Sequence, residues 1–257
     1  MNGPEEAMIL AAGTGRRMRP LTDGTPKALV DVAGFSALER VAAALAGAGV
    51  RHLIVNAHHH AEKVASAATR LGREGLDVTV SREDFVSEAP LETGGALRCA
   101  APLFRTAAPF LLHNADVLTD LDLAELYQAH LRGWETDGRL ATLVVTRRET
   151  ARALKVDPDG VYGRVNRTEG WEVIARHPET SGTGEVGFSG IHVVSPRIFA
   201  LLTERGTFSI IDAYLRLIGL GEVIATYDAT DAAWHDIGTP ERLKAARAAF
   251  RAEGGRP

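Results

Sequence analysis

The stretch that decides the fold is Ala7-Met8-Ile9-Leu10-Ala11-Ala12-Gly13-Thr14-Gly15, near the start of the chain. Its apolar run ends in glycines, which is typical of a buried strand that leads into a tight loop. The small residues let backbone N–H groups approach a ligand closely and form a concavity that binds anions. The segment therefore predicts a strand of a parallel sheet with an anion site at its carboxyl end.

Positive charge is concentrated directly after this loop. Arg16, Arg17, Arg19 and Lys27 all lie between positions 16 and 27. A bound polyphosphate would account for this density of cations. The segment lacks both the G-x-x-x-x-G-K-[ST] of a P-loop and the third glycine of a dinucleotide-binding loop. The alternative is a solvated turn that carries surface arginines.

Length and composition restrict the class of protein. The 257 residues are 45% hydrophobic and 24% charged, and we expect them to form one domain, 1–257. The net charge of −4 argues against a nucleic-acid binder, which is usually strongly basic. No run reaches the ~18 apolar residues of a membrane span, and the first residues do not resemble a secretory signal. A single cysteine, Cys99, fits a reducing compartment, so we expect a cytoplasmic protein.

Strands and helices alternate in the first half of the chain. Near-continuous apolar strands between amphipathic helices predict an α/β fold, a Rossmann-like and mostly parallel sheet with helices on both faces. Ser36 and Glu39 have the spacing of a capping box, and Asp122 is a further helix cap. The expected strands are 7–12, 52–56, 78–80 and 110–113, and the expected helices are 37–48, 61–73, 95–103 and 122–131.

The pattern changes after residue 139. Asp157-Pro158-Asp159-Gly160 predicts a hairpin turn between two short strands, so the second half is expected to add antiparallel strands to the sheet. The expected strands are 140–146, 154–156, 161–165, 171–175, 186–194 and 223–227, and the expected helices are 211–218, 240–251 and one that begins at Pro196.

Four motifs, in this order, resemble those of a known family. They are Leu10-Ala-Ala-Gly13-x-Gly15-x-Arg17-Met18-x-Pro20-Leu-Thr22-x-x-x-Pro26-Lys27, Leu91-Glu92-Thr93-Gly94-Gly95, His113-Asn114-Ala115-Asp116-Val117 and Trp234-His235-Asp236-Ile237-Gly238-Thr239-Pro240-Glu241. Together they are similar to the signature of the sugar-1-phosphate nucleotidyltransferases. The resemblance covers roughly residues 7–250. It is strongest to compact members without a C-terminal β-helix, such as the N-acetylmuramate-1-phosphate uridylyltransferases and the short mannose-1-phosphate guanylyltransferases.

The resemblance implies a fold of the nucleotide-diphospho-sugar transferase type, with a nucleotide-binding half, 7–135, and a sugar-phosphate-binding half, 136–250. It implies an Mg²⁺-dependent in-line displacement that joins a sugar 1-phosphate to a nucleoside triphosphate and releases pyrophosphate. UTP and N-acetylmuramate 1-phosphate are the preferred pair. Guanylyl transfer to mannose 1-phosphate, cytidylyl transfer to phosphocholine and a non-catalytic nucleotide-sugar sensor stay open. The expected partners are these two substrates, without nucleic acid or membrane, in a monomer or small homo-oligomer.

The resemblance also implies a role for each site residue. Arg17, Lys27 and Asp116 are the expected catalytic residues, and Asp116 and Asp236 are the expected Mg²⁺ ligands. The expected nucleotide-binding residues are Leu10, Ala11, Ala12, Gly13, Thr14, Gly15, Arg17, Lys27, Asn56, Gly94, Gly95 and Asn114. The expected sugar-phosphate-binding residues are Glu185, Ser189 and Gly190.

The position of Asp116 supports its role independently. It follows a predicted strand, and open parallel sheets bind ligands beyond the carboxyl ends of their strands. Mg²⁺ commonly takes one or two carboxylates and completes its coordination with water and substrate phosphates. Because Asp116 and Asp236 are far apart in the sequence, only the folded chain can join them. The alternatives are a turn cap at Asp116 and a surface turn at Asp236.

Overall fold

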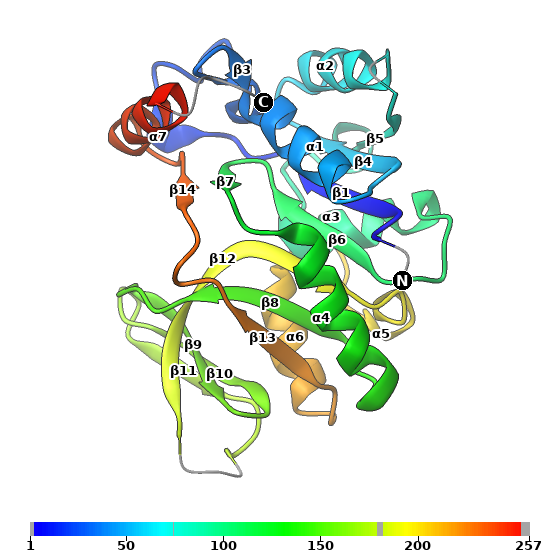
Figure 1. Ribbon diagram of the computed structural model, residues 1–257, viewed down its shortest axis with the longest axis vertical. Helices are drawn as coiled ribbons and strands as arrows, with labels where there is room; N and C mark the ends of the chain where they lie inside the picture. Colours follow the sequence, from blue (N-terminus) through cyan, green and yellow to red (C-terminus); the bar gives the residue numbers. More distant parts are fainter. Residues whose placement is uncertain (1–2, 74, 179–181, 253–257) are drawn as a thin grey trace.

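The computed structural model describes residues 3–73, 75–178 and 182–252. A parallel sheet of four strands, in the order β6-β1-β4-β5, forms the first half (Figure 1). The four strands are β1 (Glu6–Leu10), β4 (His52–Ala57), β5 (Asp77–Arg82) and β6 (Phe110–Asn114). The connecting helices are α1 (Ala37–Gly47), α2 (Ala61–Arg73), α3 (Glu92–Ala100) and α4 (Leu123–Thr136). The Rossmann-like sheet that the sequence predicted is confirmed.

The second half extends the same sheet through one long strand. β12 pairs in antiparallel fashion with β6, β8 and β9, while β13 runs parallel to β8. The strands are β8 (Ala141–Thr146), β9 (Arg152–Asp157), β10 (Gly160–Asn166), β11 (Trp171–Ile174), β12 (Gly184–Val194) and β13 (Ile224–Asp228). The helices are α5 (Ile198–Leu201), α6 (Ile210–Ile218) and α7 (Pro240–Ala252). The expected antiparallel addition and the 157–160 hairpin turn are confirmed.

Alternate residues of the central strands enter two separate hydrophobic cores. In β1, Ala7 and Ile9 pack with α1, α2, α4 and α7, while Met8 packs with α3, α5 and α6 on the other face. This alternation follows from the two-residue period of a strand. Because both faces are covered, β1, β4 and β6 are mostly apolar and buried, as the sequence indicated, whereas polar and apolar residues alternate in the edge strand β5.

Both predicted helix caps are confirmed, and the expected start of the third helix is wrong. Ser36 and Glu39 form the capping box of α1, and Asp122 accepts hydrogen bonds from the first turn of α4. The helix expected at 95–103 begins earlier, at Glu92, and ends at Ala100. A 3-10 turn, η4 (Ala101–Leu103), follows it. Two consecutive glycines disfavour a helix on propensity alone, but packing against the segment before α6 overrides that preference here.

A short strand pair that the sequence did not predict connects the middle of the chain with its C-terminal part. β14 (Trp234–Asp236) runs antiparallel to β7 (Val117–Thr119), and Asp236 lies opposite Val117. The amide of Ile237 donates a hydrogen bond to the carbonyl of Asp116, at 2.9 Å. This pairing places the two aspartates of the predicted metal site next to each other in space.

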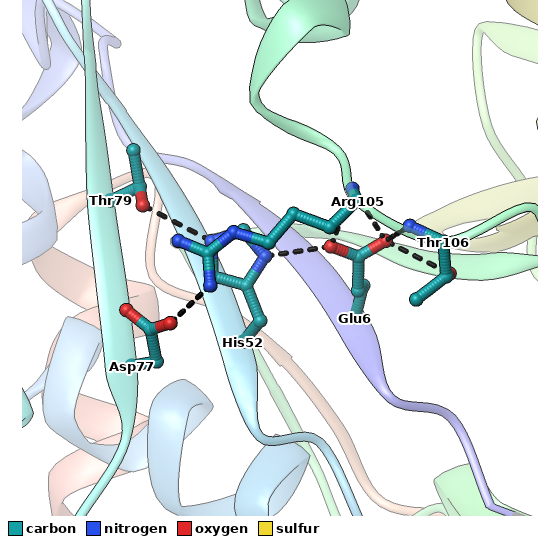
Figure 2. Close-up of polar contacts among 6 residues, drawn as sticks. All are labelled: Glu6, His52, Asp77, Thr79, Arg105 and Thr106. Atoms are coloured by element: carbon teal, nitrogen blue, oxygen red, sulfur yellow. Dashed lines mark hydrogen bonds and ion pairs between the residues drawn. The ribbon is translucent and has the colours of Figure 1, made fainter.

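A buried carboxylate organises the opposite, amino-terminal edge of the parallel sheet (Figure 2). Glu6, only 2% exposed, accepts hydrogen bonds from the His52 ring at 2.7 Å and from the backbone and hydroxyl of Thr106, both at 2.9 Å. Burial alone would raise the pKa of Glu6, but these hydrogen bonds hold it below its ordinary value. The contacts join β1 and β4 to the loop that precedes β6.

We predict that Glu6→Gln lowers the free energy of unfolding by about 2–3 kcal/mol, because several hydrogen bonds to a charged acceptor are weakened or lost. The sheet edge that carries Glu6 lies at the far end of β1 from Leu10, so the kcat of the folded variant should equal that of the wild type. Denaturant unfolding and initial rates check this. Asp77→Asn, which changes an exposed ion pair with Arg105, is the control and should alter stability little. Unchanged stability in Glu6→Gln would contradict the structural role of the carboxylate.

Buried histidines predict a loss of stability in acid. Burial lowers the pKa of His113 to about 4 and of His130 and His192 to about 3, from 6.5. Between about pH 6.5 and pH 4 the unfolded chain therefore binds more protons, so stability falls as the pH falls. The expected decline in unfolding free energy from pH 7 to pH 5 is about 2 kcal/mol for each histidine. His130→Gln should show a correspondingly smaller decline, and an identical decline would contradict this account.

Candidate active site

A cavity of about 440 Å³ opens at the carboxyl ends of β1, β4 and β6. It brings together eleven of the residues that the sequence selected: Leu10, Ala11, Ala12, Gly13, Thr14, Gly15, Arg17, Lys27, Asn56, Asn114 and Asp116. The rest of the lining consists of residues that were not predicted from the sequence: Arg16, Ala28, Glu83, Pro90, Glu92, Thr93, Ala115 and Gly238. We call this the first cavity.

The loop after β1 folds back over itself at Gly15. Gly15 has φ +63°, and a Cβ on it would lie 2.9 Å from Cγ2 of Thr22. The Thr22 hydroxyl donates a hydrogen bond to the Gly15 carbonyl at 2.8 Å and closes the turn. Glycine is therefore required here, because another residue would meet both backbone strain and a collision.

A buried polar chain fixes the mouth of the first cavity. Asn56 accepts a hydrogen bond from the Ala11 amide at 2.6 Å, and its own amide group donates to Glu83 at 2.6 Å. The second carboxylate oxygen of Glu83 accepts from the Leu91 amide at 3.1 Å. β1 consequently ends at Leu10, not at Ala12, because Asn56 replaces the next strand partner. Glu83 was missed because nothing in the sequence marks a carboxylate after β5 as buried.

The predicted catalytic and metal residues form one charged group. Lys27 donates a hydrogen bond to Asp116, and Arg242 pairs with Asp236. A Cβ built on Gly238 would lie 2.7 Å from Oδ1 of Asp236 and 2.9 Å from a guanidinium nitrogen of Arg17. Two carboxylates and the cations that balance them therefore meet at the rim of the first cavity.

Gly94 and Gly95, which were expected to bind the nucleotide, do not line the first cavity. Their amides donate hydrogen bonds to the Phe208 carbonyl at 3.0 Å and 3.3 Å. A Cβ would lie 2.3 Å from the Phe208 ring at Gly94 and 2.4 Å from the Gly206 carbonyl at Gly95. Close packing thus explains both glycines, and their expected contact with a nucleotide stays a prediction.

Three further residues were expected to bind the sugar phosphate. Glu185 lines a second cavity of about 770 Å³, together with Arg147, Arg148, Glu149, Thr150, Ala151, Ala153 and Arg167. Ser189 is 1% exposed, and its hydroxyl has no hydrogen-bond partner among the described residues. A Cβ on Gly190 would lie 2.7 Å from the Asn114 amide nitrogen, so glycine lets β12 pass close to the first cavity. Neither Ser189 nor Gly190 lines the second cavity.

Comparison with known proteins identifies the family. The model of the family described as Nucleotidyl transferase matches residues 6–253. The chain belongs to this family. It is 31% identical to the N-acetylmuramate alpha-1-phosphate uridylyltransferase of Neisseria meningitidis serogroup B, over 95% of this chain and 97% of that protein. It is 28% identical to the mannose-1-phosphate guanyltransferase of Yarrowia lipolytica, over 92% of this chain but only 61% of that protein.

Solved structures share the fold of this nucleotidyltransferase. HddC from Yersinia pseudotuberculosis has a TM-score of 0.72 at 22% identity, over 96% of this chain and 99% of that one. UDP-glucose pyrophosphorylase from Acinetobacter baumannii has a TM-score of 0.74 at 18% identity, over 97% and 94%. The expected family, fold type and class of enzyme, a sugar-1-phosphate nucleotidyltransferase, are confirmed.

The described residues contain neither a candidate membrane span nor a separate cluster of metal ligands. No helix among them has the length and apolar character that a membrane crossing needs. Likewise, in the part of the chain that the structure describes, no three His, Cys, Asp or Glu side chains converge as a metal site of their own.

We predict that Gly238→Ala lowers kcat/KM by about 10²-fold, since the new methyl group must displace Asp236 or Arg17 by a fraction of an ångström or more. The melting temperature should change little, because residue 238 lies at the rim of a cavity. Gly24→Ala is the matched control, because a Cβ there meets nothing within 4 Å. Wild-type kinetics in Gly238→Ala would show that the positions of Asp236 and Arg17 do not limit the reaction.

Proposed function

We propose that this enzyme transfers a uridylyl group from UTP to N-acetylmuramate 1-phosphate and releases pyrophosphate. The observation that carries the proposal is the convergence of Arg17, Lys27 and Asp116 in the first cavity with Asp236 at its rim, from three separate segments of the chain. A non-catalytic sensor would not need all four groups. The relative of N. meningitidis, whose full length this chain matches, supports the choice of substrates.

The reaction is a single displacement at phosphorus. An oxygen of the sugar phosphate attacks the α-phosphorus of UTP, the new P–O bond forms, and the bond to the β-phosphate oxygen breaks. The second pKa of a phosphate monoester is about 6, so the nucleophile is already largely a dianion at neutral pH. No general base is needed, and the remaining obstacle is repulsion between two anions. Catalysis is then mainly a matter of position and charge.

The residues of the first cavity divide this work. Backbone groups of the Ala11–Gly15 loop would bind the triphosphate, and Arg17 and Lys27 would stabilise the charge that gathers on pyrophosphate. Carboxylates suit Mg²⁺ as ligands, and two of them leave room for water and phosphate oxygens, so Asp116 and Asp236 would hold the ion. When bound, Mg²⁺ supplies charge neutralisation between the two substrates.

The rest of the molecule fits this assignment of roles. The first cavity is built mainly from residues 10–116 and the second from residues 147–185, which supports a nucleotide half, 7–135, and a sugar-phosphate half, 136–250. Cys99 is a free thiol, in keeping with the proposed cytoplasmic location. It is partly exposed on α3 because Leu97 and Ala100 occupy the buried face.

Guanylyl transfer to mannose 1-phosphate is the second candidate, on the basis of the Yarrowia lipolytica relative. A matrix of four nucleoside triphosphates against N-acetylmuramate 1-phosphate and mannose 1-phosphate separates the two, with pyrophosphate release and the nucleotide-sugar product as readouts. UTP with N-acetylmuramate 1-phosphate should give the highest kcat/KM. Absence of product from every pair, at any Mg²⁺ concentration, would overturn the proposed function.

We predict that Asp116→Asn and Asp236→Asn each reduce kcat by about 10²-fold or more, because each removes one charged partner of the cation between the substrates. The affinity for Mg²⁺, read from the dependence of rate on its concentration, should weaken in both variants. Asp120→Asn, on the same segment as Asp116, is a control that keeps the wild-type kcat. A near-normal rate in either of the first two variants would contradict the metal assignment.

A further inference from the structure

Arg148 lies two residues after the end of β8. Its side chain is half-buried and lines the second cavity. Neither the four family motifs nor the predicted site residues include it. Its surroundings nevertheless have the features of a binding site for an anion.

The structure holds the Arg148 guanidinium group rigidly. One face stacks on the Trp234 ring, with the guanidinium carbon 4.2 Å from the ring centre. The side chain donates hydrogen bonds to the Phe188 carbonyl at 2.7 Å and the Thr146 hydroxyl at 3.1 Å. A Cβ on Gly187 would lie 2.7 Å from its Nε, so the backbone of β12 lies close to the group as well. A side chain fixed in this way loses little entropy when it binds a ligand.

Arg148 differs from two nearby arginines in its ion pairing among the described residues. Within residues 3–73, 75–178 and 182–252, no Asp or Glu forms an ion pair with Arg148, whereas Arg147 pairs with Asp228 and Arg167 pairs with Glu185. Only two of the five N–H groups of the guanidinium take part in the hydrogen bonds above. A partly buried charge without a directly paired carboxylate is costly, which favours a ligand that supplies negative charge.

The side chain also lies close to the proposed metal ligands. Trp234 and Asp236 are two residues apart in β14, so their side chains leave the strand on the same face. Burial lowers the pKa of Arg148, and the nearby Asp236 carboxylate acts in the opposite direction. The Trp234 indole donates a hydrogen bond to the Ser189 carbonyl at 3.0 Å, which connects β14 to β12. An anion bound by Arg148 would thus lie beside the reaction centre.

We propose that Arg148 binds the phosphate of the acceptor substrate and holds it beside Asp116 and Asp236, with the sugar extending into the second cavity. This rests on the proposed function, because it assumes a sugar 1-phosphate as acceptor. A planar guanidinium suits the geometry of a phosphate, which it can bind through two parallel N–H groups. Arg40 and Arg98 also donate to backbone carbonyls, but neither lines the first or the second cavity, and a purely structural role for Arg148 would not change substrate affinity.

The test compares Arg148→Gln, Arg148→Lys and a control, Arg152→Gln, in the enzyme. The control residue carries the same charge, is exposed, pairs with Glu169 and lines neither the first nor the second cavity. Initial rates give KM separately for the nucleoside triphosphate and for each sugar 1-phosphate, and thermal melting reports folding. Arg148→Gln should raise KM for the acceptor by at least about tenfold and leave KM for the triphosphate within about twofold, because a hydrogen bond to a charged group is lost. Arg148→Lys should recover part of the loss, and Arg152→Gln should behave as the wild type.

A second arm distinguishes the phosphate from other anionic groups. N-Acetylmuramate 1-phosphate carries a carboxylate on its sugar and mannose 1-phosphate does not, so contact with the phosphate predicts the same weakening for both. Loss with the acidic sugar alone would overturn the proposal, as would an unchanged KM for both acceptors. Titration of the two sugar 1-phosphates into the Mg²⁺-loaded enzyme with a non-hydrolysable UTP analogue gives the same comparison without turnover.

The titration also keeps this inference separate from the proposed function. If the wild type forms no nucleotide sugar, the proposed function fails. Saturable binding of a sugar 1-phosphate that Arg148→Gln loses would still support the role of Arg148. Equal affinity in wild type and Arg148→Gln, or no binding in the wild type, would overturn that role.

Discussion

The pairing of β14 with β7 is the constraint on which the catalytic arrangement depends. Asp116 lies near the middle of the chain and Asp236 near its C-terminal end, and the hydrogen bond from the Ile237 amide to the Asp116 carbonyl joins the two segments directly. Bringing two carboxylates together costs free energy unless cations compensate their charge. Lys27 and Arg242 provide that compensation in the structure, and a divalent ion would provide it during the proposed reaction. The site is thus organised around balanced charge.

The same principle extends over both cavities. Arg16 and Arg17 line the first cavity and Arg148 lines the second, and none of the three forms an ion pair with a described carboxylate. Other arginines beside the second cavity are neutralised by the protein itself, as Arg167 is by Glu185. Uncompensated cations on either side of the two aspartates are what a reaction between two phosphorylated molecules requires. The buried polar cluster around Glu6 stabilises the sheet at its other edge, away from this charge.

The sequence predicted those features that depend on residues close together in the chain. The end of the first strand before the glycine loop, the Ser36 capping box and the alternation of strands and helices in the first half depend on neighbouring residues, and the structure agrees with them. Glu83 and Arg148 could not be found in this way, because their roles depend on Asn56 and Trp234, which lie far along the chain. Gly94 and Gly95 have the pattern of a ligand-binding turn, yet packing against Phe208 accounts for them. The residues whose roles depend on contacts between distant segments were therefore the ones that could not be predicted from the sequence patterns.

The central claim is that Asp116 and Asp236 hold one divalent cation between the two substrates. The most direct test is a crystal structure with Mn²⁺ and a non-hydrolysable UTP analogue, in which anomalous scattering locates the metal. The account predicts one anomalous peak within about 2–2.5 Å of an oxygen of each aspartate and of an α-phosphate oxygen. A nucleotide bound outside the first cavity, or a metal that contacts neither aspartate, would contradict it.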